Sequence, residues 1–515
     1  MPGDPAGTRE AVRRLGFVFP GGRAVLRLTG LIAALPWPIL FVVVGNHLAS
    51  PDITRGVVFE TVYRLLHGQG IYPAPSGAFV ALDYNPLMYY LDAAAALLFG
   101  LNPATLRVVA AAGSLGAAFL VHLAVRRATG SPWCGLLATG LYAAAYRAFD
   151  CYLDYPQPDS WMLLTALLGL LLLQDEKRRG RIALGVALLA AAFWFKQQGA
   201  LLAIGGVLYL TWRLGLRRAA PYWVLAALLG PFAYFVLGPH WFGPNFLYYT
   251  WEVPHAYSQF RVRGLLHAGW YFGRFWAIPL ALALFALFDR LRRRAPPDVW
   301  GFTLPCAGLI GLLGAMDFSE HNVYIPAATW LIIVGVSALP RAADRIAHLP
   351  PARQAGAGAG LAAAIALAFA ATAYDPREVL VPRGAWRDYD ALVAQVNHLA
   401  GPVYMPGVGQ LPGEIRLPVP VHWVPLEDLV RGRAHHHSGD PLVREVLKDV
   451  LAPAGEAFII ADRRLDEDTL LAFLDPHYEL VEDMGDRYAS LRAQPGWYSG
   501  RTWPRYLYRH RGSAP

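Results

Sequence analysis

The segment from Ser50 to Gly100 reads SPDITRGVVFETVYRLLHGQGIYPAPSGAFVALDYNPLMYYLDAAAALLFG. It lies between a first apolar run and a long series of further apolar runs. Charged groups beside a lipid phase are costly unless they have a partner or a task. The segment nevertheless carries several polar residues next to aromatic and proline residues, among them Asp52, Arg55, Glu60, Asp83 and Asn85. It therefore predicts a functional loop at a membrane surface.

The composition of the whole chain is that of a polytopic membrane protein. Of its 515 residues, 55% are hydrophobic and only 16% are charged, whereas a soluble chain carries about 25% charged residues. The net charge of +8 comes with arginines in short loops between apolar runs, which is typical of orientation signals and argues against a nucleic-acid partner. The three cysteines, Cys134, Cys151 and Cys306, form neither a disulfide framework nor a zinc spacing.

The apolar runs predict about eleven membrane spans, since a span needs about 20 apolar residues. They cover 28–48, 104–125, 132–149, 159–174, 181–196, 198–214, 219–238, 266–288, 299–316, 322–340 and 356–373. The arginine-rich loops fall on one side, together with the N-terminus, and that side is predicted to be cytoplasmic. The first run is longer than the apolar part of a signal peptide, so we interpret it as an uncleaved span.

Two short helices are predicted inside the first external loop, 49–103. The run from Pro86 to Gly100 is short for a span, and counting it as one would place most arginine clusters outside. The second helix, 54–68, has apolar residues at helical spacing and ends at Gly68.

The composition changes after Tyr374, where charged residues become frequent. We therefore predict a membrane domain over 1–373 and an external α/β domain over 374–515. Pro and Gly punctuate the expected strands and helices of the second domain. The strands are expected at 403–407, 421–426 and 457–464, and the helices at 439–451 and 466–474.

Asp52 and Arg55 form the first candidate catalytic pair. A transferase that uses a lipid-phosphate sugar needs a base for the acceptor hydroxyl and a cation for the leaving phosphate. Asp52 and Arg55 are three positions apart at the start of a predicted helix, so one helical turn could supply the base and the cation. Asp52 is equally suited to cap the helix. Glu60 is the rival base.

A second acidic group occupies the turn DCYLDYPQPDSW, residues 150–161. Its three aspartates, including Asp154 and Asp159, are a candidate site for a divalent cation, for an arginine partner or for the acceptor. Asp159 is also in the right place to be a helix N-cap.

Further candidates lie at predicted external turns. Lys196 suits a lipid phosphate or a snorkelling position at the interface. The loop 245–263 mixes aromatic rings with His255, Arg261 and Arg263, a pattern typical of sugar stacking and equally of an interfacial aromatic belt. His435–His437 are a candidate metal cluster, but a solvated loop is the simpler interpretation.

Several short motifs follow one another along the chain. After the loop acid come L-L-x-G-x-x-I-Y (Leu65–Tyr72), Y-N-P-L-x-Y-Y (Tyr84–Tyr90), L-F-G (Leu98–Gly100), Arg107, PDSWMLL (158–164), F-K-Q-Q (195–198) and H-N-x-Y-I-P (321–326). In this order, which covers most of the membrane region, they resemble the GT-C superfamily, and specifically its family 39 type. That type includes the protein O-mannosyltransferases and the aminoarabinose transferase that modifies lipid A.

The resemblance implies a glycosyltransferase of a bacterial inner (plasma) membrane that takes a sugar from a polyprenyl-phosphate donor on the external side. Its acceptor would be a lipid, a glycan or a protein. Asp52 would be the base, Arg55 the phosphate-side cation and Asp159 the second acid. The implied substrate-binding residues are Tyr84, Asn85, Asp154, His255, His321, Asn322 and Tyr324.

The chain departs from the family pattern at several positions. Ile53 stands where a Glu is usual, and Gly56 where a Tyr is usual. Asn85 replaces a frequent Lys, so phosphate binding must draw on Lys196, Arg261, Arg263 or Arg274. Some relatives use a Glu as the loop acid, which keeps Glu60 as an alternative base. A protein that only binds or transports a polyprenyl lipid or glycan is the alternative function.

Overall fold

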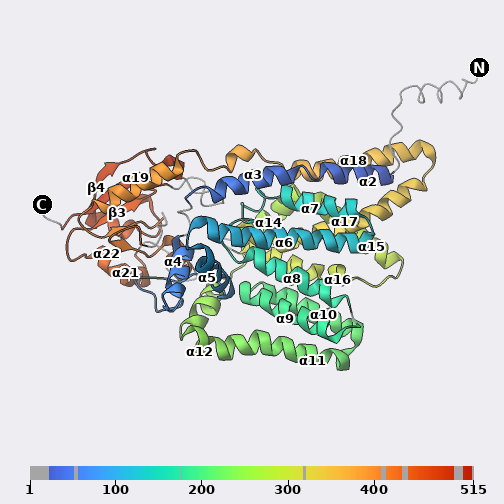
Figure 1. The fold of residues 1–515 in the computed structure, drawn as a ribbon, viewed down its shortest axis with the longest axis horizontal. Helices are drawn as coiled ribbons and strands as arrows, with labels where there is room; N and C mark the ends of the chain where they lie inside the picture. The colour runs from blue at the N-terminus through green and yellow to red at the C-terminus, as the bar shows by residue number, and fades with distance from the viewer. Residues whose placement is uncertain are drawn as a thin grey trace, which may run out of the picture.

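The computed structural model describes residues 22–51, 56–175, 177–316, 320–407, 413–431, 439–491 and 503–512. Long helices lie side by side along the long axis of the molecule, and a small α/β region occupies one end (Figure 1). The helices before this region are α2 (Gly22–Ile32), α3 (Pro36–Leu48), α4 (Gly56–Leu66), α5 (Leu87–Phe99), α6 (Pro103–Thr129), α7 (Pro132–Ala144), α8 (Asp159–Leu173), α9 (Arg179–Phe195), α10 (Gly199–Leu214), α11 (Leu216–Ala227), α12 (Gly238–Phe242), α13 (Val253–Tyr257), α14 (Val262–Phe275), α15 (Ala277–Arg292), α16 (Val299–Leu312), α17 (Ile325–Ala347) and α18 (Pro351–Thr372).

The local sequence explains where these helices begin and end, and α6 is an example. The side chain of Asn102 accepts a hydrogen bond from the Thr105 amide, and Pro103 occupies the first turn, where its missing N–H costs nothing. The helix ends at Gly130, which has φ +69°, a conformation that glycine adopts without strain.

Fewer helices reach spanning length than the sequence predicted. Within the described residues, five helical stretches are long and apolar enough to cross a membrane, or six if the bent pair α14–α15 counts as one. Each of the eleven predicted runs falls on helical structure. However, α8, α10 and α16 have 14 to 16 residues, short of the ~20 that a span needs. The count of eleven is therefore not established.

The predicted run 266–288 is not one straight helix. It is divided between α14 and α15, which meet at an angle of 87°. Trp276 is the non-helical residue between the two helices and is fully buried.

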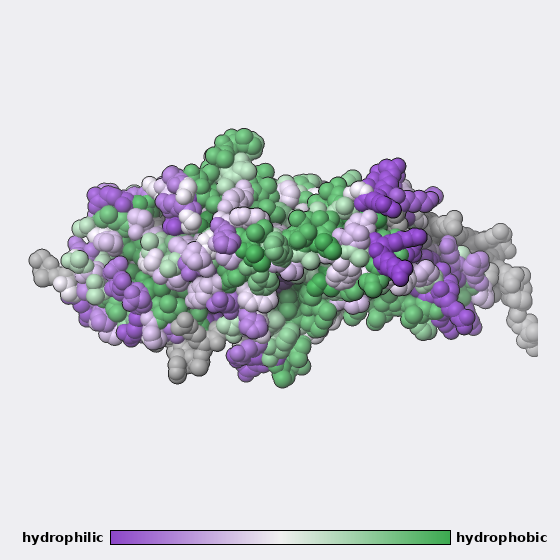
Figure 2. Space-filling model, turned by 90° about the horizontal axis from the view of Figure 1, so that it is seen from below, coloured by the Kyte–Doolittle hydropathy of each residue, from purple (hydrophilic) through white to green (hydrophobic). Residues whose placement is uncertain are grey.

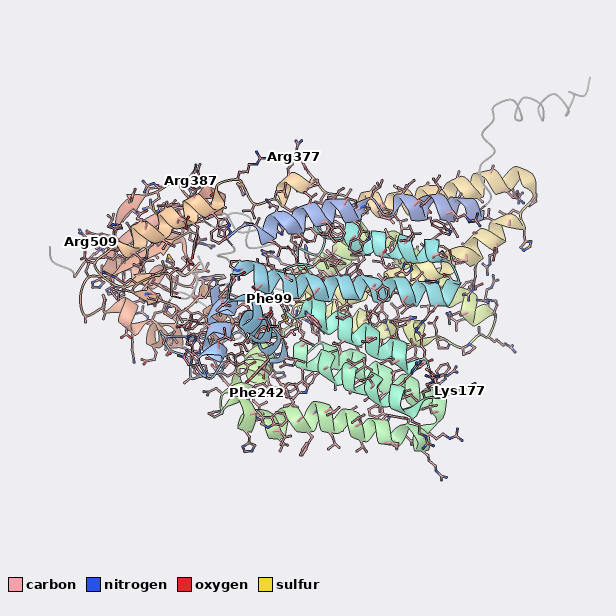
Figure 3. All side chains as sticks on the ribbon, in the orientation of Figure 1. Phe99, Lys177, Phe242, Arg377, Arg387 and Arg509 are labelled. Atoms are coloured by element: carbon pink, nitrogen blue, oxygen red, sulfur yellow. The ribbon has the colours of Figure 1, made fainter. Side chains whose placement is uncertain are left out.

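The first loop contains both expected short helices. In α4, Val57, Val58 and Thr61 are buried, and Gly68 beyond it has φ +67°. Helix α5 has 13 residues, and its C-terminal tip exposes Leu97, Leu98 and Phe99 to 74–77%. Figure 3 labels Phe99. Such an exposed apolar tip fits contact with lipid.

The C-terminal region, residues 374–512, holds a five-stranded sheet in the order β2-β1-β3-β5-β4. Strands β1, β2 and β3 are parallel to each other, and β5 pairs antiparallel with β3 and β4. The elements are α19 (Ala385–Asn397), β1 (Val403–Tyr404), β2 (Pro418–Val419), α20 (Trp423–Val430), α21 (Pro441–Val446), α22 (Lys448–Leu451), β3 (Phe458–Ala461), β4 (Tyr478–Asp483) and β5 (Tyr506–His510).

Two sequence predictions in this region are wrong. Residues 421–426 were expected to form a strand, but most of them belong to helix α20, which His422 caps by accepting a hydrogen bond from the Val424 amide. Residues 466–474 were expected to form one helix, but they lie in and between two 3₁₀ turns. Strands β2, β4 and β5 and helix α19 were not predicted.

The surface is divided in the way a membrane protein requires. Figure 2 shows hydrophilic surface gathered at the two ends and hydrophobic surface between them. Large exposed apolar side chains include Phe41 on α3, Val224 on α11 and Leu284 on α15.

Candidate functional site

A cavity of about 330 Å³ lies where the helical bundle meets the C-terminal region. Its walls come from the first loop, the turn after α9, the segment around α13, the start of the 320–326 motif and helix α20. The residues that line it include Asp83, Tyr84, Lys196, Gln197, Gln198, Trp251, His255, Tyr257, Glu320, Asn322, Trp423, Val424, Glu427, Asp428 and Arg431.

Lys196, Asp159 and Asn322, all predicted as site residues, lie together. The Lys196 ammonium donates to Asp159 Oδ1 at 2.7 Å, and the Asn322 amide donates to Asp159 Oδ2 at 3.2 Å. All three residues are at most 4% exposed. Asp159 makes no N-cap hydrogen bond, so its carboxylate serves as the charge partner of Lys196.

The backbone places Lys196 at this point. Helix α9 ends at Phe195, Lys196 is extended, and α10 begins at Gly199. A Cβ at position 199 would lie 2.4 Å from the carbonyl carbon of Ala192. The tight turn that buries the lysine therefore requires glycine.

Asp83 lines the same cavity, although it was not among the predicted site residues. Its carboxylate accepts a hydrogen bond from the Tyr257 hydroxyl, and burial raises its pKa. Gln197 donates to the Asp83 carbonyl at 2.6 Å. In the sequence, Asp83 stood out only as one of the charged residues of the first loop and by its position directly before the Tyr84–Tyr90 motif.

Helix α20 brings a second acidic group to the cavity. Arg431 pairs with Asp428 at 3.2 Å and with Glu427 at 3.3 Å, and its guanidinium lies 5.4 Å from the centre of the Tyr257 ring. Burial raises the pKa of Asp428 to about 8, although Arg431 opposes the shift, and the nearby charge of Asp83 adds to it. This wall was not predicted from the sequence, because a strand was expected at 421–426, over the first half of α20.

Tyr84 and Asn85 take different positions. Tyr84 lines the cavity, with its ring centre 5.5 Å from the Lys196 ammonium. Asn85 is fully buried and donates to the Phe193 carbonyl at 2.6 Å. This hydrogen bond connects the first loop to the end of α9.

Asp154 lies in a separate buried network. It contacts His47 at 2.7 Å, Arg107 at 3.0 Å and the Tyr146 hydroxyl at 2.7 Å. His47 Nε2 also lies 2.7 Å from the Val379 carbonyl. The network joins α3, α6 and the chain beyond α18, and it does not contribute to the lining of the cavity.

His321 and Tyr324 flank Asn322 but point to other partners. His321 Nδ1 lies 3.1 Å from Asp150, and its Nε2 lies 3.0 Å from His267. Tyr324 is buried, donates to the Gly314 carbonyl and stacks on Tyr271 at 4.1 Å. Neither side chain lines the cavity.

The remaining predicted residues are dispersed. His255 lines the cavity and stacks on Trp251. Arg261, Arg263 and Arg274 are exposed. Glu60 is half-buried on α4, burial raises its pKa, and it does not line the cavity. Three of the predicted positions, Asp52, Arg55 and His435–His437, lie outside the described residues. In the described part of the chain, no group of three or more His, Cys, Asp or Glu side chains is arranged to hold a metal.

Comparison with known proteins shows similarity at the level of structure. No protein-family model matches the chain, and no curated protein matches it. The crystal structure of ArnT from Cupriavidus metallidurans in the apo state aligns with a TM-score of 0.54 and 16% identity, over 94% of this chain and 100% of that one. The same protein bound to undecaprenyl phosphate aligns with a TM-score of 0.52 and 16% identity, over 94% and 98%. The chain therefore has the fold of ArnT, a GT-C membrane glycosyltransferase.

Proposed function

We propose that the chain is a glycosyltransferase that moves a sugar from a polyprenyl-phosphate donor to an acceptor hydroxyl at the external face of a bacterial inner membrane. The observation that carries the proposal is the buried Lys196–Asp159 pair at the wall of a cavity, in a chain with the fold of ArnT. We treat 1–373 as the catalytic membrane domain and 374–515 as an external domain that closes the cavity.

Lys196 is the proposed ligand of the donor phosphate. An ammonium has three N–H donors, and Asp159 accepts one of them. The other two have no hydrogen-bond partner among the described residues, and we propose that they donate to phosphate oxygens that enter the cavity. Asp159 also fixes the position of the ammonium, which leaves less side-chain entropy to be lost on binding. Arg55 is the second proposed cation.

An apolar groove of about 280 Å³ supports a lipid-linked donor. Its lining includes Tyr90 on α5, Trp194 on α9 and Phe242 at the end of α12; Figure 3 labels Phe242. The groove and the cavity share no lining residue, but Trp194 in the groove and Lys196 in the cavity are two residues apart. We propose that an isoprenoid chain occupies this groove with its phosphate at Lys196.

The proposed reaction is a single displacement with inversion. The acceptor oxygen attacks the anomeric carbon, the bond from that carbon to the phosphate oxygen breaks, and the polyprenyl phosphate leaves. The acceptor proton passes to a carboxylate. Asp52 is the proposed base from the family resemblance. Glu60 is a weaker candidate, because it does not line the cavity.

The test uses purified protein in lipid nanodiscs with a panel of polyprenyl-phosphate sugars, and it measures release of polyprenyl phosphate. Lys196→Met removes the charge and keeps the length of the side chain. We expect it to lower release about 100-fold, as loss of a positioned transition-state contact does. Lys177→Met, on an exposed turn at the far end of the bundle, is the matched control and should leave release unchanged.

Two results would overturn the proposal. Full release by Lys196→Met would exclude the phosphate role of this residue. Tight binding of polyprenyl phosphate by the unaltered protein, without release from any donor of the panel, would favour the alternative of a binding or transport protein.

A further inference from the structure

Helix α17 packs against both α15 and α16 and connects the cavity with the far end of the bundle. It begins at Ile325, close in the chain to Asn322 of the cavity lining, and continues for 23 residues. At a rise of about 1.5 Å per residue, its last turn lies about 35 Å further along the helix. The connection from α17 to α18 is at the end of the molecule opposite the C-terminal region (Figure 1). The charged residues at this end are therefore remote from the candidate functional site.

Two aspartates join the three helices at this end. Asp289 on α15 pairs with Arg345 on α17 and with Arg293, one turn further along its own chain. Asp298, which caps the start of α16, pairs with Arg290 on α15. Arginine stays charged in proteins, and its guanidinium matches the geometry of a carboxylate. Both carboxylates therefore already have arginine partners.

Arg341 on α17 has no such partner. It is partly buried, and within the described residues it makes no hydrogen bond and no ion pair. The strongest charges that act on it come from two arginines and two aspartates, namely Arg293, Arg290, Asp289 and Asp298. A guanidinium carries five N–H donors and no acceptor. Because other arginines engage the two aspartates, the donors of Arg341 are available to an anion from outside the chain.

The cluster keeps an excess of positive charge. Four arginines, Arg341 included, are grouped with two aspartates, so four minus two leaves at least two positive charges even if both aspartates are ionised. The surrounding surface adds Arg292, Arg294 and Asp344, all of them exposed, and leaves the excess in place. Fixed positive charge attracts an anion, and arginine binds a phosphate through two parallel N–H···O contacts.

An apolar surface reaches the same end of the bundle. Leu284, Phe288 and Leu291 on α15 are each more than half exposed, and their spacing of four and three positions places them on one face of the helix. The guanidinium of Arg292 lies 5.1 Å from the centre of the Phe288 ring. Exposed apolar side chains on a membrane protein fit the acyl chains of lipids. A ligand with both acyl chains and a phosphate therefore matches this end better than free phosphate does.

We propose that Arg341, with Arg290 and Arg293 beside it, binds the phosphate of an anionic phospholipid whose acyl chains lie along the exposed face of α15. The arginine-rich loops are predicted to face the cytoplasm, so the lipid belongs to the inner leaflet, whose negative surface attracts basic residues. Orientation of the chain depends on the number of positive charges, whereas this site depends on the position of one of them. The proposal is independent of the proposed function, because the cluster is remote from the cavity.

The test measures lipid binding to the full chain by native mass spectrometry from detergent micelles. The probes are phosphatidylglycerol, which is anionic, and phosphatidylcholine with the same acyl chains, which carries no net charge. We expect the first bound phosphatidylglycerol to bind more tightly than phosphatidylcholine. Arg341→Gln removes the charge and should weaken this binding about tenfold, the value of a hydrogen bond to a charged group. Arg341→Lys keeps the charge without the planar fork and should weaken it less.

Controls separate the site from general attraction and from a folding defect. Arg217→Gln makes the same change at an exposed position on α11, in a different basic turn, and should leave the affinity unchanged. An excess of inorganic phosphate should not displace the lipid. Without anionic lipid, Arg341→Gln should melt no lower than the unaltered protein, because the lost charge has like charges beside it and no carboxylate partner among the described residues.

Four results would overturn the site. Equal affinity for the two lipids would show that the phosphate charge is not recognised, and unchanged affinity in Arg341→Gln would exclude this arginine as the ligand. Displacement by inorganic phosphate would show a site for a free anion. A lower melting temperature of Arg341→Gln would show that Arg341 stabilises the fold itself.

Discussion

At the scale of single residues, the pairing of Lys196 with Asp159 is the feature that connects stability with chemistry. Both side chains are almost fully buried, and a buried charge without a partner is far more costly than a buried pair. The same contact that stabilises the fold therefore keeps a cation at the cavity wall.

This pairing predicts strong coupling between the two residues. We expect Asp159→Leu to destabilise the protein by about 3 kcal/mol, because it leaves Lys196 charged and unpaired. The double variant Asp159→Leu/Lys196→Met should recover at least half of this loss, since no buried charge remains. Thermal unfolding of the four proteins of the cycle measures the coupling. Additive effects of the two changes would contradict it.

Asp83 shows why a residue of a functional site can be impossible to predict from the local sequence. It is one of several carboxyl groups in the first loop, and nothing local separates it from the others. Its contacts with Tyr257 and Gln197 join it to residues more than 100 positions away. Only these contacts mark it as part of the cavity.

At the scale of elements, helix α20 brings Asp428 near Asp83 of the first loop, and the charges of the two carboxyl groups interact. The pKa of Asp428 is raised to about 8 by burial, and the pKa of Asp83 is raised as well. A carboxyl group with a raised folded-state pKa contributes stability that is complete below its unfolded pKa, ~3.9, and is lost as the pH rises through the folded value.

We therefore expect the unaltered protein to lose stability between about pH 4 and pH 8. Asp428→Asn should flatten this dependence, because an amide does not ionise. Asp449→Asn, an exposed carboxylate on α22 of the same region, is the control and should leave the pH profile unchanged. Melting temperatures measured from pH 5 to 8.5 test this expectation. If the melting temperature falls with pH equally steeply in the unaltered protein and in Asp428→Asn, the Asp428 carboxyl group does not cause the loss of stability.

Helix α20 also shows that a local sequence pattern does not always distinguish a helix from a strand. Its first residues, in VHWVPL, are apolar and β-branched enough to suggest a strand. A short apolar run does not distinguish a buried strand from a buried helix. Packing against α13 and the cap from His422 favour the helix here.

At the scale of the whole molecule, the two ends have different character. The C-terminal region occupies one end, whereas Lys177, in one of the basic turns, lies at the other (Figure 3). The positive-inside rule assigns the basic end to the cytoplasm, which would place the cavity and the C-terminal region outside.

This orientation is tested by labelling of single introduced cysteines. Arg387→Cys, at a highly exposed position of α19, should react with a membrane-impermeant maleimide in intact spheroplasts. Lys177→Cys should react only after the membrane is opened. The native Cys134 and Cys151 are buried and Cys306 is partly exposed, so labelling of the unaltered protein measures the background, and Cys306→Ser removes its most accessible source. The reverse pattern would invert the topology and exclude an external active site.

The sequence by itself determined the membrane character, the position of nearly every helix of the bundle, the short helices of the first loop and the change of composition near residue 374. These properties are sums over neighbouring residues, because transfer from water to lipid and loop charge act locally. The sequence also singled out Lys196, Asp159 and Asn322, one at a time.

Only the tertiary structure decided that these three side chains meet, that Asp154 belongs to a different network, and that Asp83 and helix α20 complete the cavity. Such contacts join residues that are 37 to 163 positions apart and lie on different elements. They depend on how whole helices pack, and no local pattern of hydrophobicity or charge encodes the distance between two side chains on different elements.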